Sequence, residues 1–230
     1  DNAYSIANEK FELTVGVPRD DIEDDNYGVY TPMMEAMGES TALHKDERVS
    51  EAVKNGFTAK CYDGQPFFSE NHQVGSITYS NKGDAKLDAE SFQAARQSIM
   101  SLKNEKGQPL NIVPNVLLVP PALEKEARMI LEAELINGTS NINKGLAEVV
   151  VWSQLADKPT QWYLLCTKRS LKPFIFQERR KAKFTAMTRE TDENVFMRSE
   201  YLYGVDARDG VGYGFWQMAY GSTGTASSMG

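Results

Sequence analysis

The sequence predicts a mixed α+β fold, and three features of its hydrophobic pattern predict it. One helical pattern runs through residues 31–56, a helix–strand–helix order fills residues 88–131, and the final third alternates like antiparallel strands. The 230 residues are 41% hydrophobic and 25% charged, close to the globular average. We therefore expect a folded chain of one or two domains, and we exclude disorder and fibrous repeats.

The N-terminal part predicts one strand followed by one long helix. Apolar and polar residues alternate over residues 11–17, which is the period of a half-buried strand. Thr31 and Pro32 then supply an N-cap and a proline at the first helical position, and apolar residues follow at helical spacing over 31–56, with Gly38 as a weak point inside. At 1.5 Å per residue this helix would reach roughly 35 Å, longer than a small globular domain needs.

The middle of the chain predicts a compact helix–strand–helix unit. It follows a turn at Asp63-Gly64 and a polar stretch of loop or short strand. A helix starts at Asp88, where Leu87 and Phe92 are placed as a hydrophobic staple. The apolar run over residues 112–119 predicts a strand buried on both faces, and the two prolines after it open a third helix.

The C-terminal third is rich in strand patterns. Residues 149–152 and 162–166 predict two strands joined by a loop. The composition of residues 221–230, rich in Gly, Ser and Thr, predicts a flexible tail. Further strands are predicted over residues 174–176, 184–187, 195–203 and 204–208.

The search for chemical motifs predicts no catalytic, cofactor or metal site. The phosphate-binding glycine loops, the hydrolase nucleophile elbow and the zinc-protease motif are absent from the sequence. Cys61 and Cys166 are predicted to be free thiols, and with His44 and His72 as the two histidines a zinc site has almost no ligands. His44 lies in a charged helical pattern and is expected to be solvated. Asp63 with His72 could form an acid–base dyad, which leaves an uncharacterised hydrolase as one alternative.

Acidic and basic residues form two opposite blocks. The net charge of −7 argues against a dedicated nucleic-acid binder. Residues 19–25 carry five carboxylates in seven positions, and residues 168–183 carry seven cations in sixteen. The blocks are either two solvated faces or complementary patches through which copies of the chain meet. The residues of this candidate subunit interface are Asp20, Asp21, Glu23, Asp24, Asp25, Lys168, Arg169, Lys172, Arg179, Arg180, Lys181 and Lys183.

The sequence also bears on membrane association and on processing of the N-terminus. No apolar run approaches the ~20 residues that a membrane-spanning helix needs, so we expect no membrane partner. The chain begins at Asp1 rather than Met, and we expect an upstream segment to have been cleaved or omitted.

Several ordered motifs resemble the major head subunit family of Mu-like phages and prophages. No single motif is specific, but together they extend over residues 11–220. They are Val17-Pro18-Arg19-Asp20-Asp21-Ile22-Glu23-Asp24-Asp25 before Gly28-Val29-Tyr30, Tyr62-Asp63-Gly64-Gln65-Pro66-Phe67-Phe68 with His72, Gly107-Gln108-Pro109-Leu110, Leu117-Leu118-Val119-Pro120-Pro121, Trp162-Tyr163-Leu164, Phe176-Gln177-Glu178-Arg179 and Tyr203-Gly204-Val205.

The resemblance implies the Hong Kong 97-type capsid fold, with a long spine helix, a peripheral domain, an axial domain and part of an extended β-hairpin. Mapped onto this chain, residues 1–87 hold the hairpin strand, the spine helix and part of the peripheral domain. Residues 88–178 form the axial domain, residues 179–220 return to the peripheral domain, and residues 221–230 are the tail.

The function that the resemblance implies is structural. We expect a major capsid protein without enzymatic activity or cofactor, whose copies form pentamers and hexamers of an icosahedral shell around phage double-stranded DNA. Contact with the DNA is expected to be weak and nonspecific. Scaffolding, portal or decoration proteins are further expected partners, with assembly in the bacterial cytoplasm and a final place in the virion head. A shell protein of a bacterial nanocompartment, which shares the fold, is the second alternative.

Overall fold

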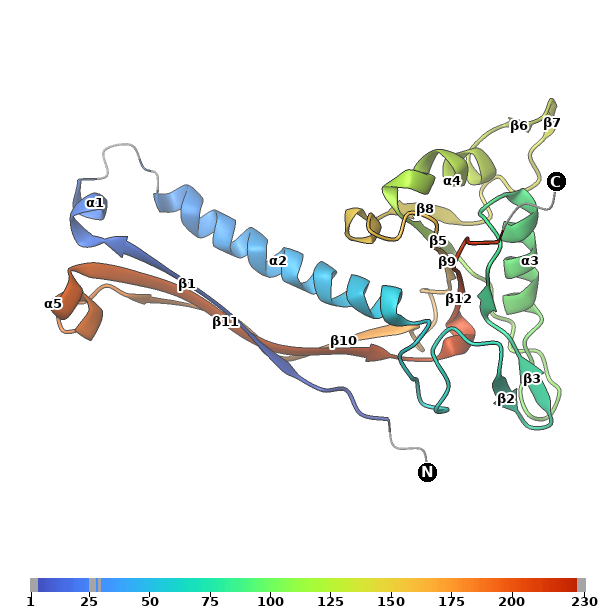
Figure 1. The fold of residues 1–230 in the computed structure, drawn as a ribbon, viewed down its shortest axis with the longest axis horizontal. Helices are drawn as coiled ribbons and strands as arrows, with labels where there is room; N and C mark the ends of the chain where they lie inside the picture. The colour runs from blue at the N-terminus through green and yellow to red at the C-terminus, as the bar shows by residue number, and fades with distance from the viewer. Residues whose placement is uncertain (1–3, 25–27, 29, 227–230) are drawn as a thin grey trace. The chain divides into compact units, whose positions relative to one another are not determined.

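The computed structural model describes residues 4–24, 28 and 30–226, and the chain forms two compact units. Unit 1 comprises residues 1–5, 49–175 and 212–230, and unit 2 comprises residues 6–48 and 176–211. Figure 1 shows the elements of both. The long helix α2 and the two long strands β10 and β11 contribute residues to each unit.

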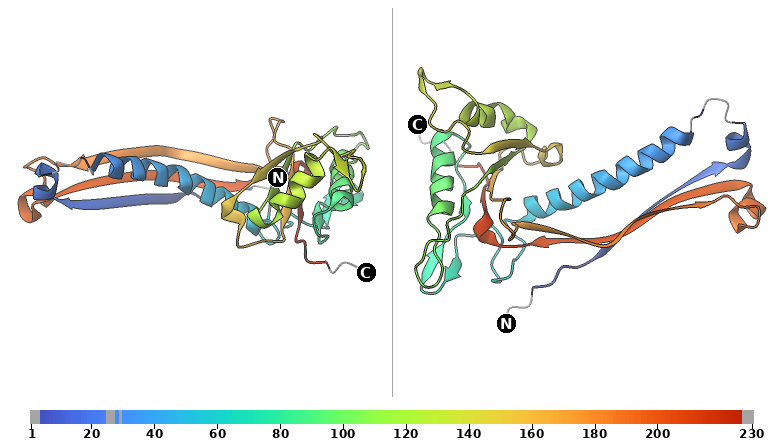
Figure 2. Two further views of the ribbon diagram at one scale, coloured as in Figure 1. Left: turned by 90° about the horizontal axis from the view of Figure 1, so that it is seen from above. Right: turned by 180° about the vertical axis from the view of Figure 1, so that it is seen from behind.

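Unit 2 is built on a three-stranded sheet in the order β1-β11-β10. β1 (Glu9–Pro18) pairs antiparallel with β11 (Glu200–Tyr213) over its whole length, which confirms the strand predicted for residues 11–17. The short helices α1 (Arg19–Glu23) and α5 (Glu193–Arg198) lie together at one end of this sheet (Figure 2), where the Arg19 N–H donates to the Ser199 carbonyl at 2.8 Å. β10 (Phe174–Met187) forms the other edge.

The predicted long helix is confirmed as α2 (Tyr30–Asn55), which has 26 residues and passes Gly38 without a break. At 1.5 Å per residue it is about 39 Å long. The expectation that His44 is solvated is wrong. Its Nε2 lies 3.0 Å from Asp209 Oδ2 and its ring stacks on Phe11 at 4.2 Å, because the strands of unit 2 pack against this side of the helix.

The core of unit 1 lies around a five-stranded sheet in the order β4-β12-β9-β5-β8. β5 lies between β8, with which it runs parallel, and β9, with which it runs antiparallel. The two strands predicted over 149–152 and 162–166 therefore exist, but β5 separates them. The strands are β4 (Lys82–Gly83), β5 (Val116–Val119), β8 (Glu148–Val151), β9 (Trp162–Leu165) and β12 (Ala219–Ser222).

The helices of unit 1 follow the predicted pattern. α3 (Ala89–Met100) is capped by Asp88, whose carboxylate accepts from the Ser91 N–H while the Ser91 hydroxyl accepts from the Asp88 N–H. The remaining elements are η1 (Pro121–Leu123), α4 (Glu124–Leu131), η2 (Ser153–Leu155), η3 (Trp216–Met218) and the short hairpins β2 (His72–Val74) with β3 (Ile77–Tyr79) and β6 (Leu135–Ile136) with β7 (Thr139–Ser140).

Two expectations for the C-terminal third are wrong. Residues 193–198 form helix α5, where a strand was expected from residue 195. The flexible tail was expected from Gly221, yet Gly221 and Ser222 are buried in β12. A Cβ on Gly221 would lie 2.8 Å from the Phe68 ring, so this glycine lets the last strand pass close to the core. Residues 227–230 of the expected tail lie outside the described residues.

The compact units also divide the chain elsewhere than at the expected boundaries. Residues 49–87, which were placed with the peripheral domain, belong to the same unit as residues 88–175. Residues 212–226 belong to that unit as well. The reason is that residues of the turn before β2 belong to the core around the sheet of unit 1, and β12 is one of the strands of that sheet.

Candidate functional site

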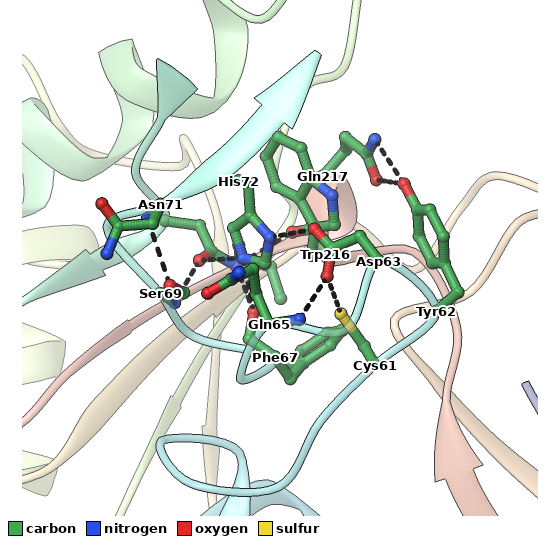
Figure 3. Close-up of polar contacts among 12 residues, drawn as sticks. Cys61, Tyr62, Asp63, Gln65, Phe67, Ser69, Asn71, His72, Trp216 and Gln217 are labelled. Atoms are coloured by element: carbon green, nitrogen blue, oxygen red, sulfur yellow. Dashed lines mark hydrogen bonds and ion pairs between the residues drawn. The ribbon is translucent and has the colours of Figure 1, made fainter. Parts of the chain in front are cut away.

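A tight turn after α2 gathers the polar residues singled out in the sequence. Asp63-Gly64 forms the turn, with Gly64 at φ +80°, a backbone conformation that glycine adopts without strain. The Gly64 N–H donates to the Cys61 carbonyl at 3.0 Å, and the Cys61 N–H donates to the Gln65 carbonyl at 2.9 Å. The chain therefore folds back on itself and brings Asp63 beside His72, the first residue of β2 (Figure 3).

The Asp63 carboxylate is the centre of this cluster. Its Oδ2 lies 2.5 Å from His72 Nδ1, so the hypothesised Asp63–His72 pair does form. Its Oδ1 accepts from the Gln65 N–H at 3.0 Å and from the Cys61 thiol at 3.2 Å. Oδ1 thus has its partners within the turn, and Oδ2 has its partner at the start of β2.

The His72 ring is fully enclosed. Its side chain has no exposed surface, and it stacks on Trp216 with the ring centroids 4.2 Å apart and an interplanar angle of 2°. Its Nε2 lies 3.1 Å from the Phe67 carbonyl and 3.0 Å from Asn81 Oδ1. Both nitrogens of the imidazole therefore have partners inside unit 1.

Asn81 fixes which way the hydrogen bonds run. Its Nδ2 donates to the carbonyls of Phe67, Trp216 and Ala219, and its Oδ1 accepts from the Ser69 N–H at 2.8 Å. Since these are backbone groups with fixed roles, the amide cannot be turned over. Nε2 of the histidine thus faces two acceptors and has to carry a proton.

This arrangement is unsuited to nucleophilic catalysis. Burial, followed by the hydrogen bond to Asp63, raises the pKa of the Cys61 thiol to about 12, whereas a catalytic thiol needs a lowered pKa. The thiol donates to Asp63, and neither His72 nitrogen is free to act as its base. The cluster gives no support to the hydrolase alternative.

The acidic block lies on and after α1. Asp20, Asp21, Glu23 and Asp24 are exposed, and Asp25 lies outside the described residues. Arg19, at the start of the same helix, pairs with Glu23 at 2.7 Å and with Glu190 at 3.6 Å. The block is thus an exposed acidic surface with one cation at its edge.

The basic block is divided between the two units, and all seven of its residues are exposed. Lys168, Arg169 and Lys172 follow β9 in unit 1, where Arg169 donates to the carbonyls of residues 110 and 111 and Lys172 donates to that of residue 167. Arg179, Arg180, Lys181 and Lys183 lie on β10 in unit 2, where Arg180 pairs with Asp206 at 2.7 Å. Within the described part of unit 2, no ion pair joins these residues to the acids of α1.

Exposed apolar side chains mark a surface that the sequence reasoning missed. On α5, Phe196 is 80% exposed and Met197 is 69% exposed. The sequence pattern did not predict this exposed pair, because residues 195–203 were interpreted as a strand, in which every second side chain is buried. The available signal was Asp192-Glu193 before an apolar pair, since acidic residues favour the first turn of a helix.

Comparison with known proteins identifies the family. The family model described as Mu-like prophage major head subunit gpT matches residues 1–86, 77–155 and 153–228. This chain belongs to that family. The major capsid protein of Escherichia phage Mu is 37% identical over 218 residues, and the Mu-like prophage FluMu major head subunit of Haemophilus influenzae is 34% identical over 219. Each match covers 95% of this chain and 52% of the relative, so the chain spans about half the length of these head proteins.

Solved phage capsids share the fold. A chain of the bacteriophage JBD30 procapsid is 36% identical, with a TM-score of 0.55, over 98% of this chain and 55% of that one. A chain of the cyanophage P-SCSP1u capsid is 10% identical, with a TM-score of 0.61, over 94% of this chain and 72% of that one, and it shows the fold alone. The fold is therefore α+β and Hong Kong 97-like, and the nanocompartment and hydrolase alternatives are not supported. No described helix is long and apolar enough to cross a membrane.

Proposed function

We propose that this chain acts as part of a major capsid protein, whose copies form the pentamers and hexamers of an icosahedral shell around phage double-stranded DNA. The observation that carries the proposal is the 36% identity to a JBD30 procapsid chain over 98% of this chain. In the proposal the protein has no catalytic role and needs no cofactor for assembly. It assembles in the bacterial cytoplasm and remains in the virion head.

The two compact units suit the two domains of such a shell protein. We assign unit 2, with β1 and residues 30–48 of α2, to the peripheral domain, and unit 1 to the axial domain. The spine helix is then α2, and β1 is the strand assigned to the extended hairpin. β1 pairs with β11 on one edge, and an edge strand with a free side is suited to pairing with a further segment.

The charged blocks and α5 are the proposed contacts between copies. Closed rings of subunits need heterologous contacts, in which one surface meets a different surface on the next copy. The acids of α1 and the cations of β10 lie in one unit, and no ion pair joins the two groups among its described residues. Glu23 and Arg180 pair within the chain, and the other exposed members of the two blocks are the ones proposed to meet a neighbour. Exposed ion pairs contribute about 0–1 kcal/mol each, so we expect them to set orientation while many weak contacts together hold the shell.

Contact with the packaged DNA is proposed to be weak and nonspecific. The net charge of −7 repels phosphate on average, and local cations supply the remaining attraction. Scaffolding, portal and decoration proteins are the further partners that a shell of this kind meets.

The test is charge reversal on β10 in the full-length protein, expressed in bacteria and examined by electron microscopy. Arg179→Glu with Lys181→Glu changes two exposed residues and avoids Arg180, which pairs with Asp206 inside the chain. We expect at least a tenfold loss of closed shells with an unchanged circular dichroism spectrum. The matched control reverses Lys103 and Lys106, which are exposed in unit 1.

A charge swap completes the test. Adding Asp20→Lys and Asp21→Lys to the β10 variant restores opposite charges and should recover shells. Shells of normal number from the β10 variant alone would refute the role of the charge blocks. Failure of the unaltered full-length protein to form shells with its head-assembly partners would refute the proposed function itself.

A further inference from the structure

Three different metal-binding side chains meet in the turn of unit 1. Cys61 Sγ, an Asp63 carboxylate oxygen and a His72 ring nitrogen all lie within 4.8 Å of one another. Figure 3 shows the imidazole beside one oxygen of the carboxylate and the thiol beside the other. Thiolate with imidazole is the donor combination that zinc-class ions prefer, whereas magnesium and calcium prefer oxygen alone.

The hydrogen bonds around His72 leave Nδ1, the ring nitrogen that faces Asp63, as the one able to bind a cation. Nε2 faces the Phe67 carbonyl and Asn81 Oδ1, so its proton is committed there. In the neutral ring Nδ1 then carries a lone pair, and it lies 2.5 Å from a carboxylate oxygen. Two lone pairs cannot face each other at this distance without a positive ion between them. Metal-binding histidines typically donate the opposite N–H to a carbonyl, as His72 does.

The charges of the site balance for a divalent ion. In the absence of metal, one proton lies between Nδ1 and the carboxylate, and a second lies on the Cys61 thiol. Exchanging these two protons for one divalent cation leaves a neutral imidazole, one carboxylate and one thiolate. The buried net charge is unchanged, so the exchange avoids the cost of burying an uncompensated charge.

We propose that Cys61, Asp63 and His72 bind one divalent transition-metal ion of the zinc class. Zinc lies about 2.0–2.3 Å from sulfur, nitrogen and oxygen ligands, which sets the ligands of a tetrahedron more than 3 Å apart. Asp63 therefore has to move away from His72, and its side chain, 16% exposed, is the one member of the site open to solvent. Water fills the fourth position. The site ties the turn after α2 to β2 and does not depend on the proposed shell function.

The experiment is cobalt titration of metal-free full-length protein, because cobalt replaces zinc and its bond to a thiolate absorbs light. We expect one equivalent of Co²⁺ to give a thiolate-to-cobalt band that Zn²⁺ abolishes.

The chain supplies its own controls, because it has two cysteines and two histidines in all. C61S should abolish the band, and H72Q should weaken cobalt binding at least tenfold. C166S and H44Q should leave the band and the cobalt affinity unchanged. X-ray absorption of the unaltered zinc-loaded protein should show one sulfur and one imidazole ligand, a result that does not depend on any variant folding. Absence of the band at millimolar cobalt, or a zinc spectrum without sulfur, would overturn the proposal and leave a shared proton as the bound cation.

Discussion

Replacing Asn81 should destabilise unit 1 more than replacing another side chain of similar size. The residue is 2% exposed, and its side chain makes five hydrogen bonds to three separate segments: residues 67–72, η3 and the start of β12. Asn81→Ala removes all five and leaves buried carbonyls and N–H groups without partners. The Phe67 carbonyl keeps its contact with His72 and the Trp216 carbonyl keeps the Ala219 N–H, which reduces the loss.

The expected cost follows from these contacts. A buried hydrogen bond contributes about 1 kcal/mol net, and a buried group left unpaired costs about 1–3 kcal/mol. We therefore expect Asn81→Ala to lower the free energy of unfolding of unit 1 by about 3–5 kcal/mol, which is in the upper tail of single substitutions.

The assay is urea unfolding followed by tryptophan fluorescence. All three tryptophans, at positions 152, 162 and 216, lie in unit 1, so the signal reports this unit. Asn71→Ala is the matched control, since Asn71 is exposed on the same loop. A loss below about 1 kcal/mol for Asn81→Ala would refute the assigned network, because water would then satisfy these groups equally well.

Two further predictions concern pH and unit 2. Burial raises the pKa of the Tyr163 and Tyr213 phenols well above their ordinary value. Above pH ~10 the unfolded chain therefore loses these protons before the folded chain does, so the free energy of unfolding should fall as the pH rises. Urea unfolding at pH 9, 10 and 11 measures this. An unchanged stability across that range would contradict it. Asp209→Asn should destabilise unit 2 by about 2–4 kcal/mol, because the buried carboxylate pairs with His44 at 3.0 Å and with Arg48 at 3.4 Å. Faster hydrogen exchange of α2 up to residue 48 would confirm this, and unchanged exchange would contradict it.

Local patterns carried the sequence predictions that hold. The strand β1 follows from a strict period of two, and α3 begins at Asp88 because the capping residues are adjacent in sequence. The length of α2 follows from helical spacing between a proline-marked start and Gly56. Each of these signals lies within the element that it predicts.

Long-range contacts decided the features that could not be predicted. His44 has charged neighbours in sequence, but Phe11 and Asp209 cover it from distant strands. β12 has a tail-like composition, and it is ordered because β9 and β4 pair with it on either side. The Asp63–His72 pair was predicted as one possibility. The hydrogen bond from Cys61 to the same carboxylate depends on the geometry of the turn, which sequence spacing alone does not fix.

The place of β12 in its sheet sets a time order for the biosynthesis of the protein. β4 is an edge strand that pairs with β12, and β12 begins 136 residues after β4 ends. A ribosome that has produced everything up to η3 still holds a nascent chain whose sheet is open. Domains fold as units during synthesis at about 5–20 residues per second, so unit 1 stays incomplete for at least several seconds after β4 has been made. The sheet of unit 1 thus closes only once the residues between β4 and β12 have been made.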